Sequence, residues 1–231
     1  MAAPTAAPAD RTHFALMLLG DARLPSGGHA QSAGLEGALT AGMPGEDIPA
    51  YLRMRLRTVA SVDAGTAVAA LGALTGPPPA GLALIQQHWA ARTPSQVQRQ
   101  ASITLGRGLF RLLHNVFPGD VATQAIAEVE SPCRPLVLAG LARALGLAAA
   151  ELATLVCFDE VQTVTAAALK LSPLDPLQAV CWALDVRPLV DEVVNALAQV
   201  TTPTQIPSRS APLMDQWQHD HARRNRRLFS A

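Results

Sequence analysis

A serine, two glycines and a histidine follow one another in the chain, from Ser26 through Gly27 and Gly28 to His29. A serine becomes a nucleophile when a base takes its proton, and histidine is a common base. The base must also be oriented by a third group, and nothing near this segment supplies one. We therefore interpret the segment as a shaped turn with no catalytic residue. The alternative is a small all-α enzyme of unknown class that uses Ser26, His29 and Lys170.

The densest group of metal-ligating side chains is His219-Asp220-His221. On a helix, positions i and i+2 point about 200° apart, so the two histidines could not hold one ion there. In an extended tail they could share a face. His219 and His221 are therefore weak candidates for metal ligands, and solvated histidines are the favoured interpretation. We expect no stably bound cofactor or metal.

Lys170 is the only lysine in the chain, and it follows Leu169. A phosphate-binding loop of the Walker type needs a Gly-Lys step, so this chain has no such loop. Three cysteines are too few, and odd in number, for a disulfide framework. They favour a reducing, cytoplasmic setting.

The 231 residues carry 18 basic and 18 acidic side chains, and 49% of them are hydrophobic but only 4% aromatic. This apolar content excludes a disordered chain. Zero net charge gives no electrostatic basis for general nucleic-acid binding. A core of Ala, Leu and Val favours closely packed helices. No membrane span is expected, because the best apolar stretch, 135–158, is interrupted by Arg143 and Glu151.

Helical periodicity extends along almost the whole sequence, and no alternating strand pattern is present. We predict an all-α, single-domain bundle of about eight to ten helices. Its parts are a flexible N-terminal tail at 1–12, a helical domain at 13–200, and a Pro/Thr-rich linker with a basic partner-binding tail at 201–231. The predicted helices are 14–20, 32–42, 50–74 (one long helix or two in tandem), 82–91, 94–116, 136–145, 148–171 and 176–200. Pro188 is the expected place of a kink in the last one.

Arg55 falls on the apolar side of its predicted helix, whereas Arg53 and Arg57 fall on the opposite side. We favour an arginine that extends from the rim of the apolar face to solvent. The alternative is a buried pair with a carboxylate such as Asp63 or Glu36.

The end of the chain combines charge with two apolar side chains, Leu228 and Phe229. A solvated, frayed end is one interpretation. The other is a segment that folds onto a protein partner, with Phe229 as the anchor and the arginines facing carboxylates. The arginines in question are Arg223, Arg224, Arg226 and Arg227.

Three blocks of the sequence resemble the UreF family of urease accessory proteins. The first is LPSGGHAQSAGLE at 24–36, the second is 159–176 with LKLSPLD at 169–175, and the third is 219–230 with its RLFS ending. They occur in the family's order and spread over 14–231. The chain departs from the family at His29, at Asp175-Pro176 and at Asp220, which weakens the transfer of individual contacts at these positions.

The resemblance implies a non-catalytic, all-helical homodimer in the cytoplasm. Such a protein bridges a UreD-type (or UreH-type) accessory protein and a UreG-type GTPase, and the assembled complex delivers nickel to apo-urease. The resemblance makes Arg223–Phe229 the tail that docks on the UreD-type protein. It makes Ser26, Gly27, Gly28, His29 and Glu36 candidates for contact with the GTPase or for shaping the dimer.

Overall fold

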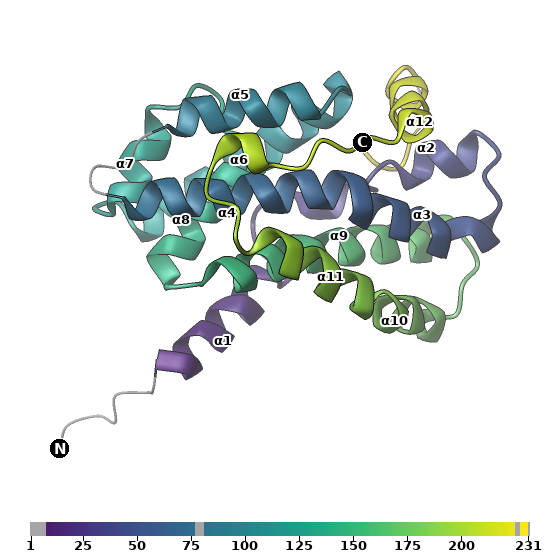
Figure 1. Ribbon diagram of the computed structural model, residues 1–231. Helices are drawn as coiled ribbons and strands as arrows, with labels where there is room; N and C mark the ends of the chain where they lie inside the picture. Colours follow the sequence, from purple (N-terminus) through teal and green to yellow (C-terminus); the bar gives the residue numbers. More distant parts are fainter. Residues whose placement is uncertain (1–7, 77–80, 225–226, 231) are drawn as a thin grey trace.

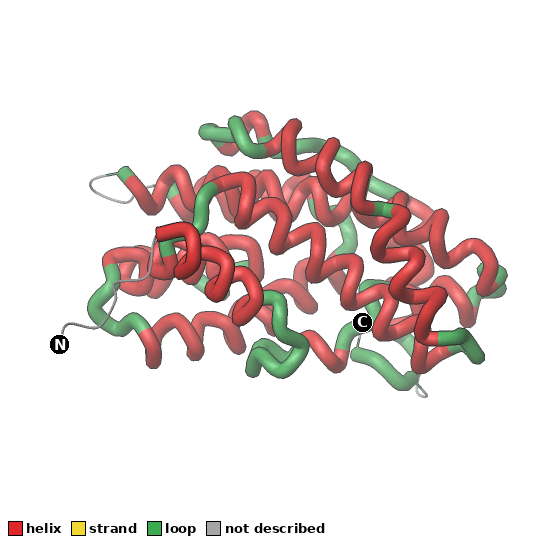
Figure 2. Tube along the Cα trace, turned by 90° about the horizontal axis from the view of Figure 1, so that it is seen from below, coloured by secondary structure: helices red, strands yellow, loops and turns green. Residues whose placement is uncertain are grey.

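The structure is a computed structural model that describes residues 8–76, 81–224 and 227–230, and these residues form helices and loops without a strand (Figure 1, Figure 2). The predicted all-α fold is confirmed. The helices are α1 (Pro8–Leu19), α2 (Leu35–Thr40), α3 (Ile48–Arg55), α4 (Ser61–Thr75), α5 (Leu82–Arg92), α6 (Gln96–Val116), α7 (Val121–Ala127), α8 (Arg134–Leu145), α9 (Ala149–Leu171), α10 (Pro176–Asp185), α11 (Arg187–Leu197) and α12 (Pro212–Ala222). Short 3₁₀ turns lie at Gly28–Ala30, Gly45–Asp47 and Pro203–Gln205.

A π turn at Leu56–Ala60 joins α3 and α4 into one continuous rod. Even with these two taken as one, the described residues form more helices than the eight to ten predicted. The additional ones are short. Helix α7 has seven residues and begins after Asp120, whose side chain accepts a hydrogen bond from the Ala122 amide. The predicted helix at 176–200 is two helices that meet at Val186. Pro188 lies in the first turn of α11, where its missing N–H is not needed.

Helix α4 lies at the centre of the bundle, and α5, α8, α9 and α11 pack around it (Figure 1). Its facing side chains are mostly alanine, valine and leucine, which allows several helices to approach it at once. Helix α6 packs on α8, and α12 packs on α2 and α6. The N-terminal helix α1 begins at Pro8, inside the range expected as a tail.

Among the described residues, two helices are long and apolar enough to cross a membrane, Gly45–Thr75 and α9. The most apolar stretch of the first helix is 72% buried inside the protein, and that of α9 is 61% buried. Core helices have the same length and composition, so these two helices are only weak evidence for a span.

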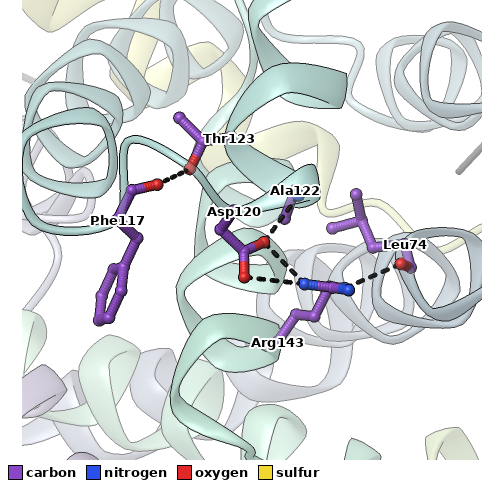
Figure 3. A network of polar contacts seen from close by, with 6 residues as sticks. All are labelled: Leu74, Phe117, Asp120, Ala122, Thr123 and Arg143. Carbon is purple, nitrogen blue, oxygen red and sulfur yellow. Dashed lines mark hydrogen bonds and ion pairs between the residues drawn. The ribbon is translucent and has the colours of Figure 1, made fainter.

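A polar network ties three helices together at one end of α4. Arg143 of α8 donates to both carboxylate oxygens of Asp120, at 2.7 and 2.9 Å, and to the Leu74 carbonyl of α4 at 2.9 Å. Figure 3 shows the guanidinium between these two acceptors, with the Asp120 carboxylate also capping α7. The network therefore fixes the ends of α4, α7 and α8 relative to one another.

We predict that Arg143→Met lowers the free energy of unfolding by about 1–2 kcal/mol, because it leaves a partly buried carboxylate and a carbonyl without a donor. The measurement is urea denaturation followed by circular dichroism. Arg187→Met is the control, since Arg187 is 79% exposed and lies 4.0 Å from its partner Asp191. That change should cost less than about 0.5 kcal/mol. Equal losses in the two variants would contradict the assigned role of Arg143.

Candidate functional site: the glycine loop, the tail and a buried charge cluster

The loop that precedes α2 has an unusual backbone. Gly27 and Gly34 have φ angles of 84° and 79°, and Ala33 has a φ of 53°. The left-handed region costs a residue with a Cβ atom about 1 kcal/mol or more, so Ala33 must be held there by its surroundings. The Tyr51 hydroxyl of α3 donates to the Ala33 carbonyl at 2.6 Å. This hydrogen bond anchors the end of residues 24–34, here called the glycine loop, to α3.

Two glycines bring α12 against α2. A Cβ atom on Gly37 would lie 2.7 Å from the Trp217 carbonyl oxygen, and one on Gly34 would lie 2.6 Å from the Gln218 side-chain nitrogen. The Trp217 carbonyl belongs to the backbone, so Gly37 has no room for a side chain, and at Gly34 both Gln218 and Tyr51 would have to shift. The Gly-Leu-Glu-Gly sequence at 34–37 therefore serves to seat α12, and the Trp217 ring stacks on Tyr51 at 6.5 Å between centroids.

Glu36 lies between these glycines and is only 9% exposed. Its two carboxylate oxygens each accept one hydrogen bond, from the backbone amide of Leu228 at 2.7 Å and from that of Phe229 at 2.8 Å. Nε2 of His221 lies 3.0 Å from the oxygen that Phe229 also contacts, within ion-pair distance but outside hydrogen-bond geometry. A buried carboxylate is stable only when its oxygens are satisfied. Here the chain's C-terminal segment supplies the donors.

The tail then continues along the glycine loop. The Ser230 amide donates to the Ala30 carbonyl at 2.8 Å. Phe229 is 4% exposed, and the Lys170 ammonium lies 5.2 Å from its ring centroid, a cation–π distance. Phe229, expected as an anchor for a partner, is therefore buried against its own chain in this structure, where it holds the tail in place.

The two histidines of the tail have different environments. Both lie in the last turn of α12, with His219 exposed and His221 2% exposed. The expectation of solvated histidines is wrong for His221, because its side chain faces Glu36 across the α2–α12 contact. No group of three potential metal-ligating side chains occurs in the described part of the chain.

The remaining predicted site residues lie on or near the same face. Ser26, Gly27 and Gly28 are half-buried, and His29 is exposed. No hydrogen bond joins Ser26 to His29 in the described residues. On the tail, Leu228 is 62% exposed. Arg223, Arg224 and Arg227 are also exposed. Arg226 lies outside the described residues.

Arg55 is 4% exposed and pairs with Glu160 of α9, which is 9% exposed. The favoured interpretation of a solvent-reaching arginine is wrong. The alternative of a buried pair is right in kind, but the partner is neither Asp63 nor Glu36. Nη1 of Arg55 is buried without a hydrogen-bond partner in the described part of the structure. Arg53 and Arg57 are exposed, as predicted.

Arg55 and Asp63 line a common polar cavity of about 80 Å³ behind the glycine loop. Residues eight apart on a regular α-helix point about 80° apart. The intervening π turn takes up one extra residue, which reduces this to about 20°. The turn thus places both side chains on one face. Arg134 and Asp159, which pair at 2.5 Å, complete the charged wall.

Asp63 is half-buried on this wall and accepts a hydrogen bond from Trp89 Nε1 at 2.8 Å. Burial raises the pKa of Asp63 to about 6, although the Trp89 hydrogen bond and the Arg134 charge act in the opposite direction. Burial also raises the pKa of the Cys157 thiol to about 12, so this cysteine is not a nucleophile at neutral pH.

We predict that Glu36→Gln releases the tail without unfolding the bundle. The amide keeps one oxygen but places an NH₂ group toward a backbone donor, and each hydrogen bond to a charged group is worth about 1.5–3 kcal/mol. Hydrogen exchange of the amides at 227–230 should accelerate about tenfold or more. Glu46→Gln, at an exposed position, is the control. Unchanged protection in Glu36→Gln would show that the tail is held by other contacts.

We predict a pH-dependent effect of Asp63→Asn. The carboxyl group has an unfolded pKa near 3.8 and a folded pKa near 6. Its contribution to stability is therefore complete below pH 3.8 and is lost as the pH rises through 6. The asparagine variant can still accept from Trp89 and should exceed the wild type by about 1 kcal/mol at pH 7.5, with a smaller difference at pH 5.

Urea denaturation at the two pH values measures this difference, and Asp47→Asn at an exposed position is the matched control. A wild-type protein that is more stable than Asp63→Asn at pH 7.5 would contradict the assigned environment of Asp63.

Comparison with known proteins identifies the family. The UreF family model matches residues 44–186. The UreF urease accessory protein of Mycobacterium sp. (strain JLS) is 35% identical over 219 residues, which cover 94% of this chain and 97% of the relative. The Mycolicibacterium vanbaalenii protein of the same name is 37% identical over 227 residues, again covering 94% and 97%. The Mycobacterium tuberculosis (strain H37Rv) protein is 32% identical, covering 93% and 96%.

These relatives are named as accessory proteins and not as enzymes, so the alternative of an enzyme that uses Ser26 and His29 is not supported. The relatives cover nearly the whole chain, and the family model covers residues 44–186 within it. The chain belongs to the UreF family of urease accessory proteins.

Proposed function

We propose that this protein is a non-catalytic urease maturation factor that bridges a UreD/UreH-type accessory protein and a UreG-type GTPase. Apo-urease is the final recipient, and nickel is handled by the assembled complex without a stably bound cofactor in this chain. The observation that carries the proposal is the bond between Glu36 and the tail amides. It places the two segments expected to meet different partners, the glycine loop and the tail, side by side on one face.

The tail has the features of a docking segment. Leu228 is 62% exposed although its amide is fixed by Glu36, so its side chain faces solvent from a rigid backbone. Arg223 and Arg224 follow α12 directly and are exposed. Preorganised apolar and arginine side chains bind with a small loss of conformational entropy. Phe229 then contributes indirectly, because its burial sets the position of Leu228.

The same proposal includes a homodimer in the cytoplasm and a regulatory role toward the partner GTPase. An arginine supplied to a GTPase stabilises the charge that develops during phosphoryl transfer. The exposed arginines next to the glycine loop, Arg223 and Arg227, are the candidates for such a contact.

We predict that the double variant Arg224→Glu, Leu228→Asp weakens binding of the UreD/UreH-type protein about tenfold or more, because it removes an exposed apolar contact and reverses a charge. Co-purification and a titration with the purified partner measure the loss. Both side chains point to solvent, so the far-ultraviolet circular dichroism should not change. This design is sharper than removal of 213–231, which would uncover the α2 surface that α12 covers.

Arg111→Glu is the matched control, since it reverses an exposed arginine on α6 away from the tail. It should bind the partner like the wild type. Full-strength binding by the double variant would contradict the tail assignment. Absence of binding by the wild-type protein to both proposed partners would contradict the proposed function itself.

A further inference from the structure

A groove of about 600 Å³ lies between the glycine loop, the first half of α6, the end of α12 and the tail. We call it the basic groove. It adjoins the polar cavity behind the loop, and Ser26, Gln31, Ala101 and Leu105 line both. Its other walls are formed by α6 and by the segment after α12. The lining residues that matter below are Gln96, Gln100, Thr104, His219, Arg223 and Arg227.

The charges that line the basic groove have one sign. Arg223 and Arg227 are exposed cations, His219 is an exposed titratable group, and no carboxylate is among the described lining residues. The nearest acid in sequence, Asp220, follows His219 on α12 but does not line the groove. Because the whole chain has zero net charge, a groove without any acid is a local concentration of positive potential.

The groove is also preorganised. Nη1 of Arg227 lies 3.4 Å from the Ala222 carbonyl at the end of α12, and the next three residues are fixed by Glu36 and Ala30. The guanidinium is therefore held at the rim by a backbone that is itself hydrogen-bonded. Little conformational freedom remains to be lost when a ligand binds this side.

Helix α6 supplies the opposite wall. Gln96, Gln100 and Thr104 are exposed at successive turns and offer amide and hydroxyl groups. Gln96 is the first residue of α6, so the partial positive charge of that helix end adds to the charge of the arginines. The part of α6 that lines the groove spans nine residue steps, which is a length of about 14 Å. That length fits about four residues of an extended peptide.

We propose that the basic groove binds an acidic segment of a protein partner, with its carboxylates paired to Arg223 and Arg227 and its backbone lying along Gln96, Gln100 and Thr104. The inference rests on the proposed function in one respect, that the segment belongs to one of the accessory proteins with which this chain assembles. It adds a contact surface on α6 that lies outside the loop and the tail.

A photo-crosslinking experiment tests the position and the chemistry of the occupant. Cys181 is the exposed cysteine and is replaced by serine, after which Thr104→Cys carries a benzophenone label. The full-length protein is assembled with its partners, irradiated, and digested for mass spectrometry. We expect a crosslink to a partner peptide that contains at least two Asp or Glu residues. The same label at Arg111→Cys, outside the groove, should give no such product.

Charge reversal tests the pairing. Arg223→Glu, Arg227→Glu should abolish the Thr104 crosslink and weaken partner binding about tenfold or more, whereas Arg111→Glu should change neither. A complex that assembles at wild-type strength without a Thr104 crosslink would overturn the groove assignment while leaving the bridging function intact. A crosslink to a basic peptide, or to a second copy of this chain, would overturn it as well.

A direct probe does not depend on the partners. A fluorescent peptide of alternating Glu and Ala should bind the wild-type protein and lose about tenfold or more in affinity with the double charge reversal, and a Lys-Ala peptide should not bind. Equal affinity of the Glu-Ala peptide for the wild type and the variant would overturn the proposal. So would tighter binding of a single-stranded oligonucleotide than of the peptide, since the groove would then select phosphate.

Discussion

A carboxylate that is almost completely removed from water needs hydrogen-bond donors inside the protein. At Glu36 the donors are the amides of Leu228 and Phe229, which lie 192 and 193 positions further along the chain. Burial of an unpaired carboxylate costs several kcal/mol, so α2 and the tail cannot separate without either hydration of Glu36 or loss of its charge. The glycine loop is held by the same segment, because the Ala30 carbonyl accepts a hydrogen bond from the Ser230 amide. One side chain thus joins three segments that the sequence separates widely.

The buried pair on the other side of the loop follows the same principle. Burial lowers the pKa of Arg55, but the charge and hydrogen bond of Glu160, together with the nearby Tyr51 and Asp63, raise it by more in sum, so the guanidinium remains charged inside the bundle. The π turn then brings Asp63 to the same face. The cavity is therefore lined by charges of both signs, whereas the described lining residues of the basic groove in front of the loop carry one sign. The loop separates two environments of different electrostatic character.

The sequence predicts the helices of the bundle well, because the signals for a helix and its ends lie within the helix itself. Periodic apolar residues and terminal prolines and glycines locate α5, α6, α8 and α9 within a few residues. Prediction from the sequence fails where the deciding contact joins residues far apart in the chain. Arg55 was expected to reach solvent because Glu160, 105 residues away, is not recognisable as its partner. His221 was expected to be solvated for the same reason. One usable signal existed, because Gly34 and Gly37 flank Glu36 and indicate a close approach of another segment.

The bond between Glu36 and the tail also orders events during biosynthesis. Its two halves lie at opposite ends of the described chain, so the glycine loop can receive its last hydrogen bonds only after residue 230 has emerged from the ribosome. The contacts of α4 with α8 and α9 lie within 61–171, so this part of the bundle can pack earlier. A partner that recognises the loop and the tail together would therefore bind only chains in which residues 228–230 are docked on Glu36 and the glycine loop.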